Sequence, residues 1–254
     1  MSDIPVNHPL DGRGLDHVAV ALDTSDWQQF EEWCAVFGPR VGWLKVGLEA
    51  FVRWGPRAAE VALEAGGREQ QGARVFLDLK LHDIPNTVAG AVGSVRSLGV
   101  HLVTVHAGGG PTMMQAAAEA AGAELGILAV TVLTSLDESE LAALEMPGAL
   151  EERVLNWGRL AVDAGCRGLV GSALEARTLR TVLPPDRLLV TPGIRFAGGD
   201  RGDQKRVATP DRAITDGADL LVVGRALTGA SDPGPVLERL DREVLAGLAT
   251  REDR

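Results

Sequence analysis

The order of apolar and polar positions predicts a repeated strand–helix pattern along most of the chain. Eight short apolar runs occur, and helical periodicity or a helix-start cluster such as Thr24-Ser25-Asp26 follows them. The runs cover residues 17–23, 42–47, 75–80, 101–106, 126–133, 168–172, 188–193 and 220–224. Strands that alternate with helices are typical of βα units around a parallel sheet. Eight such units predict an α/β protein that folds as a single (β/α)₈ TIM barrel.

A doubly wound open sheet is the alternative fold for this alternation. It does not require so even a repeat, and no G-x-G-x-x-G motif opens the first helix, which disfavours its dinucleotide-binding version. No linker or shift in composition divides the chain. We expect a flexible N-terminal tail at residues 1–14, the barrel at 15–245 and a polar C-terminal tail at 246–254.

Three charged residues interrupt the third apolar run and the turn after it, namely Asp78, Lys80 and Asp83. The period of a strand puts Asp78 and Lys80 on one face. Charges in a buried parallel sheet are costly unless a partner of opposite sign lies beside them. Two carboxylates that flank a lysine keep it protonated and fix its direction. We interpret this stretch as an active-site proton donor; a structural ion pair at a strand end is the alternative.

Other polar residues also follow the apolar runs, where the carboxyl ends of barrel strands form the active-site mouth. They are Asp23, Lys45, His106, Thr134, Ser135, Arg195 and Arg225. After the seventh and eighth runs, Gly193 and Gly224 allow an anion to approach the backbone closely, and Arg225 suits a bidentate contact with phosphate. We expect a phosphate site there, and the glycine-rich, charged segment 196–208 suits a lid over a ligand.

The composition narrows the class of ligand. A net charge of -10 argues against a nucleic-acid-binding surface, which needs a basic patch, although local arginines suffice for a small phosphorylated molecule. No apolar run approaches the roughly 18 residues that span a membrane. The start of the chain has no apolar signal region, so we expect a cytoplasmic protein.

Cysteine and histidine positions do not predict a metal site. Cys34 and Cys166 are far apart and fit neither a disulfide framework nor a zinc motif, so we expect two reduced, packed thiols. The spacing of His82, His101 and His106 matches no known ligand motif. We expect no bound metal.

The segment 78–87, D-L-K-L-H-D-I-P-N-T, closely resembles the signature D-x-K-x-x-D-I-x-x-T of the orotidine 5′-phosphate decarboxylase family, bacterial type. Further family motifs follow in the same order between about residues 15 and 235. They are Ala21-Leu-Asp23, Lys45-Val-Gly47, Val105-His-Ala107, Leu133-Thr-Ser135, Thr191-Pro-Gly-Ile-Arg195, Asp203-Gln204 and Val223-Gly-Arg225.

The resemblance implies decarboxylation of orotidine 5′-monophosphate to UMP and CO₂, the last step of de novo pyrimidine biosynthesis, without metal or organic cofactor. It implies that Lys80 donates the proton to C6 of the pyrimidine and that Asp78 lies against the departing carboxylate. Lys45 completes the network of alternating charges.

The resemblance also implies a homodimer with shared active sites, in which Asp83 and Thr87 reach the partner's site. The remaining implied substrate contacts are Asp23 and Thr87 to the ribose, Thr134 and Ser135 at the pyrimidine, and Gln204, Gly224 and Arg225 at the phosphate, with Arg195 beside them.

Two alternative functions stay open. The Mg²⁺-dependent sugar-phosphate decarboxylases and hexulose-phosphate synthases share the D-x-K-x-x-D core, and they would need acidic ligands such as Glu49 and Asp78. A non-catalytic barrel that binds phosphorylated metabolites is the other alternative. It would bind UMP without turnover, and it would have no reason to keep Asp78 and Lys80 charged and buried.

Overall fold

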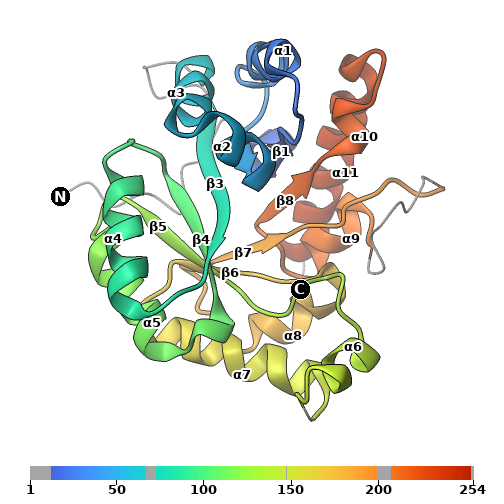
Figure 1. Ribbon diagram of the computed structural model, residues 1–254. Coiled ribbons are helices and arrows are strands. Elements are labelled where there is room, and N and C mark those ends of the chain that lie inside the picture. The colour runs from blue at the N-terminus through green and yellow to red at the C-terminus, as the bar shows by residue number, and fades with distance from the viewer. Residues whose placement is uncertain (1–12, 67–72, 147, 199–206, 253–254) are drawn as a thin grey trace.

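The computed structural model describes residues 13–66, 73–146, 148–198 and 207–252. Eight parallel strands form a closed barrel in chain order, and β8 pairs with β1 (Figure 1). The strands are β1 (Val18–Ala21), β2 (Trp43–Gly47), β3 (Arg74–Leu81), β4 (Leu102–His106), β5 (Gly126–Val130), β6 (Gly168–Val170), β7 (Leu188–Thr191) and β8 (Leu220–Val223). Each of the apolar runs forms a strand, so the predicted single (β/α)₈ barrel is confirmed.

Helices surround the barrel on its outside (Figure 1). The α-helices are α1 (Trp27–Phe37), α2 (Leu48–Trp54), α3 (Pro56–Ala65), α4 (Pro85–Arg96), α5 (Pro111–Ala121), α6 (Glu138–Ala143), α7 (Leu150–Asp163), α8 (Ala176–Arg180), α9 (Pro210–Thr215), α10 (Arg225–Thr228) and α11 (Pro233–Glu252). Short 3₁₀ helices occur at η1 (Gly14–His17), η2 (Ala107–Gly109) and η3 (Ala173–Glu175). Several helices begin at a proline, whose missing N–H and fixed φ suit the first helical turn. None of the described helices is long and apolar enough to cross a membrane.

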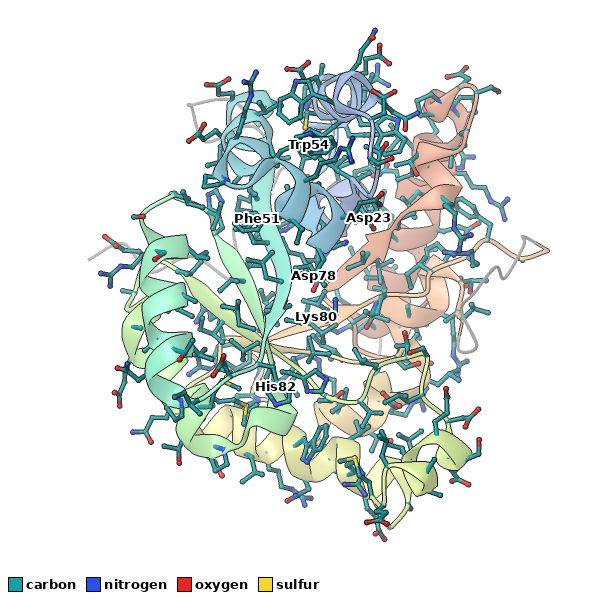
Figure 2. All side chains as sticks on the ribbon, in the orientation of Figure 1. Asp23, Phe51, Trp54, Asp78, Lys80 and His82 are labelled. Carbon is teal, nitrogen blue, oxygen red and sulfur yellow. The ribbon has the colours of Figure 1, made fainter. Side chains whose placement is uncertain are left out.

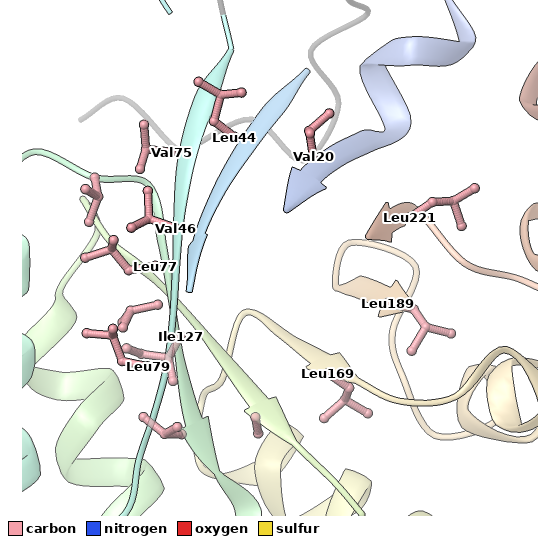
Figure 3. Packing of buried hydrophobic residues seen from close by; sticks show 14 of the residues in the cluster. Val20, Leu44, Val46, Val75, Leu77, Leu79, Ile127, Leu169, Leu189 and Leu221 are labelled. Atoms are coloured by element: carbon pink, nitrogen blue, oxygen red, sulfur yellow. The ribbon is translucent and has the colours of Figure 1, made fainter. Parts of the chain in front are cut away.

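The alternation of side chains along each strand divides the core into two layers. Residues that point outward pack against the helices in one large cluster, and Figure 3 shows Leu44, Val75 and Leu77 among them. Inward-pointing apolar residues form a separate cluster inside the barrel, consisting of Ala19, Trp43, Phe76, Leu102, Leu128, Val190 and Leu220. Continuing two residues along β2 and β3 on the same inward face leads to Lys45 and Asp78. The strand period thus places the polar residues directly above an apolar floor.

The amino ends of the strands are closed by aromatic and cationic side chains. The Arg74 guanidinium lies 4.2 Å from the centre of the Trp43 ring, and His101 meets the same ring edge-to-face at 6.2 Å. Burial, with Arg74 nearby, lowers the pKa of His101 to about 4. Cys34 and Cys166 are both buried free thiols, and burial raises the pKa of each to about 12.

The C-terminal boundary differs from the prediction. Helix α11 continues to Glu252, so the expected polar tail at 246–254 is wrong for residues 246–252. The Arg251 side chain donates to the Ala218 carbonyl at 3.2 Å and contacts an Asp219 carboxylate oxygen at 3.1 Å. Polar residues can therefore hold this last turn in place, which their composition alone did not indicate. The predicted N-terminal tail falls mainly on residues 1–12, outside the described part of the chain.

Candidate active site

A cavity of about 400 Å³ lies at the carboxyl ends of the strands. Figure 2 shows Asp23, Asp78 and Lys80 in the space that the barrel strands enclose. The polar residues that line the cavity are Asp23, Lys45, Asp78, Lys80, Thr134, Arg195 and Arg225, together with Gly193 and Gly224. Its apolar wall includes Phe76, Val132, Val170 and Val222. Residues from seven of the eight strands or the loops after them therefore meet at one site, as their positions in the sequence predicted.

Four charged side chains form an alternating array in this cavity. The Lys80 ammonium lies 2.8 and 2.9 Å from the two Asp78 oxygens. Lys45 Nζ lies 3.5 Å from Asp78 Oδ2 and 3.4 Å from Asp23 Oδ1. The Lys45 side chain is only 8% exposed, whereas that of Asp23 is 50% exposed. The array thus runs from the exposed Asp23 carboxylate through the buried Lys45 to a partly buried Asp78–Lys80 pair.

Asp78 is held in its ionised form by its neighbours. Burial alone would raise the pKa of this carboxyl group, but Lys45 and Lys80 act against burial and the net pKa is lowered. Hydrogen bonds from Lys80 and from the Thr104 hydroxyl add to the effect. Because every described contact of the carboxylate comes from a donor, the negative charge is favoured even in a mostly closed site.

The backbone at Lys80 departs from regular strand geometry. Its φ is +48°, in the left-handed region that non-glycine residues rarely adopt. The pairing of β3 with β4 shifts register between Leu77 and Leu81. The Lys80 N–H donates to Thr104 Oγ1 at 2.8 Å. The sequence period correctly predicted that Asp78 and Lys80 meet, but it did not indicate this irregularity or the part of Thr104.

Thr104 is the polar residue that the sequence analysis missed. It is fully buried on β4 and contacts both Asp78 and the backbone of Lys80. A hydroxyl in the middle of the apolar run 101–106 was the available signal, since a buried polar side chain needs a partner.

The phosphate end of the predicted site combines loop backbone with two arginines. Gly193 has a φ of +78°, which suits the turn after β7. The next residues return through a bridge between Ile194 and Ala208, and the Arg195 N–H donates to the Ala208 carbonyl at 3.0 Å. Arg195 and Arg225 line the same cavity. Gln204 and most of the predicted lid at 196–208 lie outside the described residues.

Three of the predicted site residues do not line this cavity. Asp83, Thr87 and Ser135 are all exposed, and the cavity lining does not include them. Asp83 Oδ1 accepts the Ile84 N–H at 2.6 Å, so its carboxylate is fixed near the start of α4. Within one chain, therefore, Asp83 does not flank Lys80 as its position in the sequence suggested.

The histidines do not gather at one place. His82 and His106 stack with their ring centres 5.2 Å apart, whereas His101 lies at the opposite end of β4. No group of three or more His, Cys, Asp or Glu side chains that could hold a metal occurs among the described residues.

The donors suggested for Mg²⁺ do not fit such an ion. Both Asp78 oxygens contact ammonium groups, and Glu49 is exposed and does not line the cavity.

A closed parallel barrel with a charged cavity at the carboxyl ends of its strands defines an enzyme of the TIM-barrel class. The chain belongs to the orotidine 5′-phosphate decarboxylase / HUMPS family, whose model matches residues 16–240.

Several similar proteins are named orotidine 5′-phosphate decarboxylase. An orotidine 5′-phosphate decarboxylase of Thermobifida fusca is 51% identical and covers 89% of this chain and 95% of its own length. One of Frankia casuarinae is 46% identical over 93% of this chain and 89% of its own length. The crystal structure of the enzyme from Lactobacillus acidophilus is 34% identical, with a TM-score of 0.76, and covers 89% of this chain and 98% of that one.

Proposed function

We propose that this protein decarboxylates orotidine 5′-monophosphate to UMP and CO₂ in pyrimidine biosynthesis. We further propose that it needs no metal or organic cofactor and that Lys80 donates the proton to C6. Membership of the family and the names of the similar proteins support the reaction. The single observation that carries the roles of the residues is the Lys80–Asp78 contact of 2.8 Å inside the charged cavity.

The chemistry requires a fixed cation at the reacting carbon. When the bond between C6 and the carboxylate breaks, CO₂ leaves and the electron pair stays on C6. An ammonium group held beside that carbon stabilises the developing negative charge and then transfers its proton to form the C6–H bond. Lys80 becomes neutral in that step and regains a proton from solvent. Asp78 and Lys45 would keep the Lys80 ammonium oriented toward C6 during the reaction.

The orientation of the substrate follows from the two ends of the cavity. We propose that Arg195, Gly224 and Arg225, with Gln204, bind the phosphate, because arginines and backbone N–H groups suit that anion. Asp23 would then contact the ribose, and Thr134 and Ser135 the pyrimidine. Binding energy from the remote phosphate can be used to raise turnover as well as affinity.

A homodimer accounts for two of the residues that lie outside the cavity, Asp83 and Thr87. Asp83 and Thr87 are exposed in the single chain, and so is the apolar side chain of Ile84 between them. We propose that these residues face a second copy and complete its active site. We expect this enzyme to act in the cytoplasm.

The test is the loss of orotidine 5′-monophosphate absorbance with purified protein in EDTA, with UMP identified as the product. We expect rapid turnover that added Mg²⁺ does not increase, and we expect Lys80→Ala to abolish it while UMP still binds. Activity that appears only with Mg²⁺ and a keto-sugar phosphate would instead assign the protein to the sister enzymes. Binding of UMP without turnover in the wild type would indicate a non-catalytic barrel, and near-normal turnover in the alanine variant would refute the role of Lys80.

A further inference from the structure

Thr104 connects the two charged residues of the ion pair through a single hydroxyl group. Its oxygen accepts the Lys80 N–H at 2.8 Å and lies 3.0 Å from Asp78 Oδ1. A backbone N–H can only donate, so the hydroxyl hydrogen remains available for the carboxylate. The side chain is fully buried and does not line the cavity. Its hydrogen-bonding capacity is therefore directed at these two residues and not at a ligand.

The backbone explains why such a connection is needed. Between the pairs Leu77–Val103 and Leu81–Val105, β3 advances four residues while β4 advances two. The regular ladder is interrupted there, and Lys80 adopts its left-handed φ of +48° inside the interruption. A residue in this conformation persists only when its surroundings hold it. The Thr104 hydroxyl supplies the acceptor that the ladder lacks for the Lys80 N–H.

We propose that Thr104 is a positioning residue for the proton donor, which holds the Lys80 backbone in its left-handed conformation and orients the Asp78 carboxylate. This proposal rests on the proposed function for its effect on catalysis. Thr104 does not touch the substrate cavity, and it acts only through the other two residues. The ammonium reaches the reacting carbon in the correct direction because both the backbone of Lys80 and the carboxylate partner of its side chain are fixed.

Two substitutions of Thr104 distinguish the effect of the hydroxyl group from the effect of side-chain size. Thr104→Val keeps the shape but removes the hydroxyl, and Thr104→Ser keeps the hydroxyl. We expect valine to lower kcat by at least about tenfold, the effect of a lost hydrogen bond to charged or buried groups. We expect the affinity for UMP to stay within about twofold, because UMP has no carboxylate at C6. Serine should restore most of kcat.

Thr131 provides the matched control. Its side chain is also fully buried, and its hydroxyl donates to the Val170 carbonyl at 3.1 Å, without a charged partner. We expect Thr131→Val to change kcat by less than about threefold. If Thr104→Val does not fold, Thr104→Ala takes its place in each comparison, because alanine also removes the hydroxyl and adds no methyl group in its position.

A second measurement does not depend on activity. The pKa of the Asp78 carboxyl group, followed by ¹³C NMR, should rise in Thr104→Val and stay near the wild-type value in Thr104→Ser and Thr131→Val. If the wild type lacks decarboxylase activity but this pKa still rises in the valine variant, the positioning role stands and the proposed function fails. If the wild type is active while kcat and the pKa are unchanged in the valine variant, the positioning role is refuted. Equal losses of kcat in the valine and serine variants would also refute it.

Discussion

Gly47 lies at the end of β2, where two charges of the array approach the backbone. A Cβ atom at this position would be 2.4 Å from Asp23 Oδ1 and 3.0 Å from Lys45 Nζ. Cβ atoms essentially never approach another heavy atom as closely as the first distance, so a side chain at Gly47 would have to displace the Asp23 carboxylate. The absence of a side chain at Gly47 is therefore part of the geometry of the site.

We predict that Gly47→Ala raises KM by about tenfold and lowers kcat much less, because Asp23 loses its contact with Lys45 and its proposed contact with the ribose. Steady-state kinetics with orotidine 5′-monophosphate measure this. Gly93→Ala is the control, since a Cβ there meets nothing within 4 Å in α4. An unchanged KM in Gly47→Ala would contradict the role of Asp23.

Among the helices and strands, α11 and β8 show how the chain holds its C-terminal end. Asp219, just before β8, accepts hydrogen bonds from Arg251 of α11, from Arg180 of α8 and from the Leu189 N–H at 2.8 Å. The last turn of α11 is thereby tied to the amino end of the barrel, opposite the cavity. The contacts that stabilise the C-terminal helix thus lie at the amino ends of the strands, whereas the active-site cavity lies at their carboxyl ends.

We predict that Arg251→Ala lowers the free energy of unfolding by about 1 kcal/mol, because it removes one donor from Asp219 and leaves the others. The melting temperature should fall by about 2–4 °C. Calorimetry measures both quantities, with Arg242→Ala as the control, since Arg242 is an exposed residue on the same helix. A melting temperature equal to that of the control would show that the contact does not stabilise the helix end.

For the molecule as a whole, the half-buried His101 couples stability to pH. Its pKa is lowered from 6.5 to about 4, so the folded state binds fewer protons than the unfolded state between these values. The contribution is fully present above pH 6.5 and is lost as the pH falls toward 4. We predict that His101 accounts for about 3 kcal/mol of the stability lost over this range.

Urea unfolding at several pH values tests this prediction, with His101→Asn as the comparison. Asparagine can still accept the Val75 N–H that His101 Nδ1 accepts at 3.1 Å, but it does not titrate. The loss of stability between pH 6.5 and 4 should be smaller in the variant. Equal losses in the two proteins would mean that His101 is not the group responsible.

The proposed homodimer makes a separate prediction for mixed subunits. Lys80→Ala and Asp83→Asn should each be nearly inactive alone. After the two are unfolded and refolded together, heterodimers have one site with both native residues, so the mixture should regain about a quarter of the wild-type activity. Sedimentation velocity provides the dimer fraction. Dimers without recovered activity would show that Asp83 serves its own chain, whereas full activity of Asp83→Asn alone would show that Asp83 has no catalytic role.

Local patterns in the sequence were sufficient to predict the barrel and much of its mouth. The apolar runs and the strand period place Lys45, Asp78 and Lys80 on the inward face, because side chains alternate between the two faces of every strand. The polar residues after the runs converge for an equally general reason, namely that parallel strands of a barrel end at the same rim. The predicted start of the C-terminal tail was wrong because polar residues were taken to be unable to pack, whereas Arg251 holds the last turn of α11 through its hydrogen bonds to residues 218 and 219.

Long-range contacts account for what the patterns did not predict. The register shift in β3, the left-handed Lys80 and the hydroxyl bridge from Thr104 depend on how β4 lies beside β3, 24 residues further along the chain. The close approach of Asp23 and Lys45 to Gly47 likewise depends on the pairing of β1 with β2. The sequence therefore specified which side chains of the strands face the cavity, since that follows from local periodicity. Their distances and directions arise only when the closed barrel brings separate strands together.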